Sequence, residues 1–201
     1  MPDHQEVYLD KDGYTSIIFD ITERVGVAGR GPATDGAALT THLEDIVDSD
    51  TDTIQVWKTS ETAFSKLPYV SQPPSSHLIS LSHSKTNIIT CLRSNTRTHA
   101  SSREDTPIYT LIATQTPPAH PDSKDLAPDF TAIVLNLIRL ESEHTDILIT
   151  INVPHIKGEY DEQDVDLEVG KQGKLIEDAV DYASVIWETF KIKDWGLFKE
   201  V

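Results

Sequence analysis

The sequence predicts an α+β fold, in which a central, mostly antiparallel β-sheet of about six strands is flanked by helices. Several stretches are rich in β-branched and aromatic residues, or alternate apolar with polar residues, as strands do. Two longer stretches repeat apolar residues at helical spacing. Strand and helix units do not alternate along the chain, as they would in a doubly wound nucleotide-binding fold.

The clearest strands are residues 133–140 and 147–153. The first is an almost unbroken apolar run, which is typical of a central strand covered on both faces. The second alternates, so one face should carry Ile147, Ile149, Ile151 and Val153. The short polar stretch between the two strands predicts an antiparallel hairpin. Pro154 should end the second strand.

Four upstream stretches complete the predicted sheet: residues 6–9, 14–21, 53–59 and 109–116. Helices are predicted over residues 35–47 and 174–190. The second helix has a broad apolar stripe, so it should lie across the sheet through Ile176, Ala183 and Trp187.

A chain of 201 residues suits one domain, 1–201. Within it, residues 69–107 hold nine serines and four basic residues against two acidic ones, and few apolar clusters. We interpret this segment as a disordered insertion, and hypothesise a retained intron or a mistaken exon boundary.

Composition narrows the classes of partner. The chain carries 33 acidic and 17 basic residues, and its net charge of −16 disfavours nucleic acid and anionic membranes and favours basic proteins. The lone Cys91 cannot form an internal disulfide, no apolar run is long enough to span a bilayer, and the N-terminus is polar. The expected compartment is therefore the cytosol or nucleus.

Motifs for catalysis or metal binding are missing. Glycines 26, 29, 31 and 36 lack the Gly-Lys-Ser/Thr ending of a phosphate loop, so a flexible loop is expected. The acidic run 159–168 lacks the glycine and terminal glutamate of a calcium loop. Neither zinc-ligand spacing nor a Gly-x-Ser-x-Gly elbow occurs. The prediction is no enzyme, no metal and no cofactor.

Asp20 and Glu23 follow an apolar strand. Residues three apart on a strand face opposite sides, so these carboxylates share a surface only if the strand ends near Ile21. Taken alone, the two residues suggest an ordinary solvated strand end.

Short motifs then indicate a family. The opening Pro2-Asp3-His4-Gln5-Glu6-Val7 resembles the Pro-Asp-x-Gln-Glu-Val signature of the Mog1 family. Further segments agree in the same order, namely residues 16–25, residues 42–46, Leu137-Ile138-Arg139-Leu140, Thr145-Asp146, Ile151-Asn152-Val153-Pro154 and Trp195-Gly196-Leu197-Phe198.

The resemblance implies a fold similar to that of the photosystem II protein PsbP. It also implies a non-catalytic monomer that binds the Ran GTPase, promotes release of its nucleotide and supports nuclear transport, located in the nucleus with the cytoplasm second. The family's acidic patch for Ran falls on Asp20 and Glu23 by local matching, and more weakly on Asp3, Gln5 and Glu6.

Family members carry a further segment before the opening signature, so we expect the domain to be N-terminally incomplete. Two alternatives remain open. One is a PsbP-like accessory protein without Ran binding, which would need a transit peptide rich in Arg and Ser, whereas this N-terminus is acidic. The other is a small hydrolase, which the missing motifs oppose.

Overall fold

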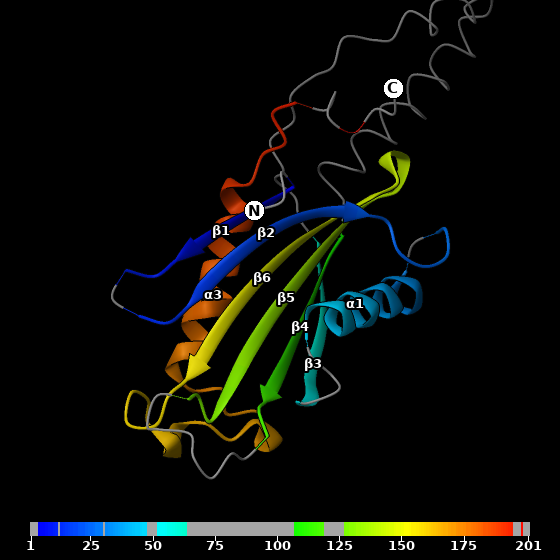
Figure 1. The fold of residues 1–201 in the computed structure, drawn as a ribbon. Helices are drawn as coiled ribbons and strands as arrows, with labels where there is room; N and C mark the ends of the chain where they lie inside the picture. Colours follow the sequence, from blue (N-terminus) through cyan, green and yellow to red (C-terminus); the bar gives the residue numbers. More distant parts are fainter. Residues whose placement is uncertain are drawn as a thin grey trace, which may run out of the picture.

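A computed structural model describes residues 4–11, 13–29, 31–47, 52–63, 107–118, 127–194 and 198. Within these residues, one six-stranded sheet has the order β1-β2-β6-β5-β4-β3, and all neighbouring strands are antiparallel. Helices α1 and α3 pack on opposite faces of the sheet (Figure 1). The predicted α+β fold is confirmed.

The strands are β1 (Gln5–Leu9), β2 (Ser16–Glu23), β3 (Thr53–Ala63), β4 (Pro107–Thr116), β5 (Phe130–Leu140) and β6 (Thr145–His155). The α-helices are α1 (Pro32–Ile46) and α3 (Gly173–Thr189). Short 3₁₀ turns are η2 (Glu141–Glu143), η3 (Glu162–Asp164) and η4 (Leu167–Val169). Every strand and helix predicted from the sequence is present, although β3 runs past its predicted end to Ala63.

The core has two halves because β5 is covered on both faces. Its residues from Ala132 to Leu140 are all buried. Leu135 and Leu137 pack on the α1 side with Leu39 and its neighbours. Val134 packs on the α3 side. The prediction of a central strand is therefore confirmed.

Helix α3 docks on the sheet as its apolar stripe predicts. Ile176, Ala183 and Trp187 are all buried. The helix begins at Gly173, where φ is +71° and an added Cβ would lie 2.7 Å from Val165 Cγ2. Glycine is required there by both backbone conformation and space.

The prediction that Pro154 ends the last strand is wrong, because β6 continues to His155. The His155 carbonyl accepts a hydrogen bond from the Asp129 N–H, so it faces β5. Backbone groups alternate in direction along a strand, so the nitrogen of Pro154 faces the β2 side, where pairing ends at Asn152. Proline therefore removes no ladder hydrogen bond at this point.

The predicted insertion, residues 69–107, lies outside the described residues except for Pro107, which begins β4 and so does not belong to it. The disorder of the other residues stays a prediction. None of the helices in the described part of the chain is long and apolar enough to cross a membrane.

Candidate functional site: an acidic end of the sheet

Asp20 and Glu23 lie at the same end of the sheet but on opposite faces. Strand β2 does not stop near Ile21, because Glu23 still pairs with Thr145 of β6. Asp20 lies opposite Leu148, which belongs to the core under α1, so Asp20 is on the α1 face. Glu23, three residues on, is directed to the other face. A surface shared by both carboxylates must therefore wrap around the end of the sheet.

The carboxylate of Asp20 is partly buried, and one of its oxygens lacks a hydrogen-bond partner. Its side chain is 28% exposed, and its Oδ1 atom lies 3.8 Å from Nε2 of His4. This Oδ1 is buried and has no hydrogen-bond partner. Gln5 is the register partner of Asp20 on β1 and therefore lies beside it on the same face.

The other two predicted residues of β1 and its flank are less closely associated with Asp20. Glu6 lies opposite Phe19 and so faces the other side. Its carboxylate accepts a 2.8 Å hydrogen bond from the Tyr8 hydroxyl. This hydrogen bond, with the negative charge of Glu6, raises the pKa of Tyr8. Asp3 lies outside the described residues.

Two further carboxylates belong to this end of the sheet and were missed from the sequence. Turn η2 connects β5 to β6 and contributes Glu141 and Glu143. The Arg24 N–H donates to the His144 carbonyl at 2.9 Å, which places the turn next to the end of β2. We call Asp20, Glu23, Glu141 and Glu143 the acidic end.

The loop that follows β2, residues 24–29, is built around Arg24. Nη2 of Arg24 donates to the carbonyls of Val27 and Gly29, each at 3.0 Å. It also pairs with Glu141 at 2.7 Å, and the Arg24 side chain is only 7% exposed. The Gly29 N–H in turn donates to Glu141 Oε1 at 2.9 Å. The loop expected to be flexible is thus tied to the acidic end.

A buried charged cluster lies beneath this loop. It consists of Asp35 and His42 from α1, Arg139 from β5 and Asp146 from β6, each at most 3% exposed. Arg139 Nη1 lies 3.0 Å from Asp35 Oδ1, and Arg139 Nε lies 3.2 Å from Asp146 Oδ1. The other Asp146 oxygen lies 2.9 Å from His42 Nε2. Removing these charges from water is costly, and their close pairing offsets that cost.

The cluster also holds the backbone of the loop. Arg139 Nη2 donates to the Val25 carbonyl, and Asp146 Oδ2 accepts from the Val25 N–H at 3.1 Å. Asp35 Oδ2 accepts from the Gly31 N–H at 2.8 Å, just before α1. This function of Arg139, which interrupts an apolar run, could not be predicted from the sequence, because Asp35 and His42 lie about a hundred residues away.

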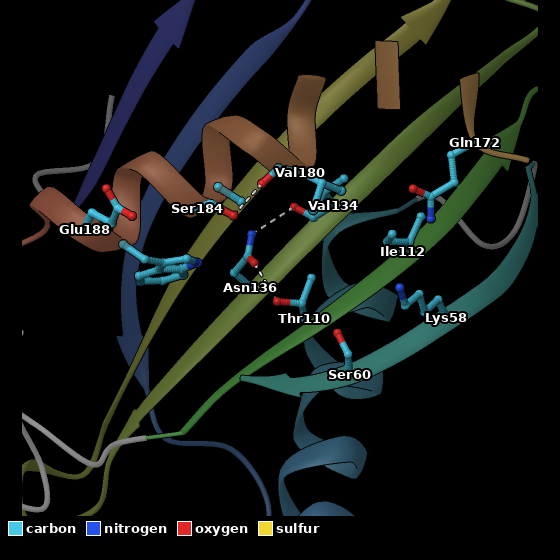
Figure 2. A pocket seen from close by; sticks show the side chains of 12 residues that line it. Lys58, Ser60, Thr110, Ile112, Val134, Asn136, Gln172, Val180, Ser184 and Glu188 are labelled. Atoms are coloured by element: carbon cyan, nitrogen blue, oxygen red, sulfur yellow. Dashed lines mark hydrogen bonds between the residues drawn. The ribbon is translucent and has the colours of Figure 1, made fainter. Parts of the chain in front are cut away.

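Two pockets elsewhere on the described surface do not bring together an acid, a base and a nucleophile. One, of about 220 Å³, lies between α3 and the β3–β5 part of the sheet (Figure 2). On its floor, Asn136 accepts from Thr110 at 2.8 Å and donates to the Ile149 carbonyl at 3.1 Å. The buried amide of this pocket is therefore satisfied by the protein itself.

The second pocket, of about 300 Å³, lies near the opposite end of the sheet and contacts His155 and Tyr160. Burial lowers the pKa of His155, whose Nδ1–H donates to the Val153 carbonyl at 2.9 Å. Burial also raises the pKa of Tyr160 to about 12, helped by its hydrogen bond to Asp129. His155 stacks on Phe130, with ring centroids 4.2 Å apart. His155, Phe130 and Tyr160 therefore form a packed aromatic cluster.

No group of three or more His, Cys, Asp or Glu side chains suited to a metal ion occurs among the described residues. The acidic run 159–168 includes η3 and η4, and its acidic residues are exposed. The absence of a metal site and of a cofactor stays a prediction.

Comparisons with known proteins agree with the fold. Residues 1–154 match the family described as Ran-interacting Mog1 protein. The structure is similar to that of a mutant of the protein Mog1, with a TM-score of 0.54, 20% identity, and coverage of 99% of this chain and 85% of that chain. It is also similar to the crystal structure of the Saccharomyces cerevisiae Ran-binding protein Mog1p, with a TM-score of 0.49, 18% identity and coverage of 92% and 76%. No curated protein matches the sequence.

Proposed function

This chain belongs to the family of Ran-interacting Mog1 proteins, and on that basis we propose that it binds the Ran GTPase and promotes release of its nucleotide. The match over residues 1–154 is the observation that carries the proposal. In this role the protein is a non-catalytic monomer that supports nuclear transport, located in the nucleus with the cytoplasm second. Its partner is a protein, and neither nucleic acid nor membrane.

The proposed contact surface is the acidic end of the sheet. Asp20 and Glu23 are its central carboxylates, with Gln5 beside Asp20. Glu6, and Asp3 from outside the described residues, are proposed as weaker contributors. A net charge of −16 favours association with a basic surface. Complementary charges speed the encounter of two proteins and fix their relative orientation.

Nucleotide release follows from reciprocal coupling. A protein that binds nucleotide-free Ran more tightly than nucleotide-bound Ran must weaken nucleotide binding by the same factor. Carboxylates suit this role because they can engage basic side chains that would otherwise hold phosphate groups. No acid, base or nucleophile is needed for such a mechanism.

The test is the release of a fluorescent guanine nucleotide from purified Ran. The unmodified protein should accelerate release, and the double variant Asp20→Lys with Glu23→Lys should reduce this acceleration by about tenfold or more, because repulsion replaces attraction. Binding by the unmodified protein should weaken as salt is raised. A matched control reverses Glu162 and Glu168, which are exposed in the 159–168 segment, and should leave the rate unchanged.

The possible results distinguish a wrong function from a wrong contact surface. If the unmodified protein neither bound nucleotide-free Ran nor accelerated release, the function would be refuted and a PsbP-like accessory role would be favoured. If a folded Asp20/Glu23 variant were as active as the unmodified protein, the site would be wrong and the function would stand. A melting curve of each variant excludes unfolding as the cause.

A further inference from the structure

We propose that residues 24–29 form a second, pre-organised contact element for Ran, with the side chain of Val27 at its apex. The proposal rests on the function proposed above and extends the contact surface beyond the carboxylates of the acidic end. Three observations support it: the hydrogen bonds that hold the loop, the exposure of Val27, and the short stretch of chain between the loop and Glu23.

The loop is held from within. The guanidinium of Arg24 occupies its centre and draws the carbonyls of Val27 and Gly29 inward, both at 3.0 Å. Charge-assisted hydrogen bonds of this kind are stronger than neutral ones. Because its polar backbone groups are directed inward, the loop has a defined shape before any partner arrives.

The loop is also held at two points along its length, and the chain is held at a third point just after it. Val25 is fixed by Arg139 and Asp146, and Gly29 by Glu141. At the start of α1, the Gly31 N–H is bound by Asp35. Apolar side chains of similar volume would often give equal or greater stability than buried ion pairs. The use of charges here therefore favours a role in holding this loop in one conformation.

The loop exposes one apolar side chain and encloses one polar atom that lacks a hydrogen-bond partner. Val27 is 71% exposed. Within the loop, Nε of Arg24 is buried without a hydrogen-bond partner. An apolar contact surrounded by charges is the usual composition of a protein interface, where the centre is apolar and the rim polar. A loop that is already ordered also loses little conformational entropy on binding.

The loop lies close enough to Glu23 to belong to the proposed Ran contact surface. Val27 follows Glu23 by four positions, a span of at most about 14 Å. An interface of ordinary size covers about 800 Å² on each protein, which corresponds to a disc of about 16 Å radius. A partner centred on Glu23 therefore reaches the apex of the loop.

The first experiment compares two exposed valines in binding assays with nucleotide-free Ran. Val27→Asp places a charge at the apex and should weaken binding by about tenfold or more. Val169→Asp is the matched control, because Val169 is 76% exposed and lies in η4, among the orange turns at the other end of the sheet (Figure 1). It should bind Ran like the unmodified protein.

The second experiment tests whether the loop is held in place by its tether. Glu141→Ala removes the acceptor of the Gly29 N–H, whereas Glu143→Ala removes an equal charge from the same turn. Amide hydrogen exchange of Gly29 should speed up by about tenfold in the first variant and not in the second. Ran binding should weaken more in Glu141→Ala than in Glu143→Ala.

Each contrary result has a distinct meaning. If Val27→Asp bound Ran normally while Asp20→Lys with Glu23→Lys did not, this inference would fail and the proposed function would stand. Equal losses in Val27→Asp and Val169→Asp would also overturn it, as would a Gly29 amide that exchanges as fast as an unstructured peptide in the unmodified protein. If the unmodified protein did not bind Ran, both proposals would be refuted.

Discussion

Replacing Arg139 with methionine should strongly destabilise the protein. Arg139 is the only arginine or lysine among the buried residues of the described chain, and it lies between Asp35 and Asp146. Methionine has a similar length but provides neither charge nor donors, so both carboxylates would stay buried without their cation. The Val25 carbonyl would also lose its donor.

The magnitude follows from the cost of an uncompensated buried charge. Removing one partner of a buried ion pair costs about 3–5 kcal/mol, a large share of a typical total stability of about 5–15 kcal/mol. In a chain of this size each kcal/mol shifts the melting temperature by about 2–4 °C. The melting temperature of Arg139→Met should therefore fall by about 6–20 °C.

The assay is thermal and urea unfolding followed by circular dichroism. A double-mutant cycle with Asp35→Asn isolates the coupling between Arg139 and Asp35, because residues that share a buried pair are not additive. Arg139→Lys keeps the charge but cannot donate to three groups in the same geometry, so it should be intermediate. If Arg139→Met melted within about 2 °C of the unmodified protein, the cluster would not contribute to stability as argued.

Two further predictions concern α3 and His155. Trp187→Ala should cost about 3–5 kcal/mol, because Trp187 is 4% exposed against the sheet; melting close to that of the unmodified protein would show that this side chain is not part of the core. Burial lowers the pKa of His155 below its usual 6.5, so the unfolded chain binds the proton more readily and stability falls as pH drops below about 6.5. His155→Phe should reduce this slope in urea unfolding between pH 7.5 and 5, and an unchanged slope would contradict the assignment.

The elements of the fold were predictable because their signals are local. The alternation of residues 147–153 and the almost unbroken apolar run of residues 133–140 both indicate strands, and both strands were found, although Leu148 and Thr150 on the second face of β6 are buried as well. The stripe that contains Ile176 and Trp187 likewise indicates the buried face of α3. Such patterns depend on neighbours in sequence, so no knowledge of the distant chain was needed.

The ends of the strands were less predictable, because hydrogen bonding to the neighbouring strands decides where each strand ends. Pro154 is tolerated within β6 only because β2 no longer pairs there. Strand β2 continues to Glu23 because β6 offers hydrogen bonds as far as Thr145, and this pairing places Asp20 and Glu23 on opposite faces. A residue such as Ile21 carries no local sign of where its strand will stop.

The chain's composition and short motifs were enough to indicate the family and an acidic character, and they are the basis for proposing Asp20 and Glu23 as contact residues. Tertiary structure alone brought the turn with Glu141 and Glu143 next to the end of β2, and placed Arg139 between two carboxylates beneath the loop. Asp35 and Arg139 are separated by 104 residues, and such a pair leaves no periodic trace in the sequence. It becomes visible only when strand pairing and helix packing have brought both residues to the same end of the sheet.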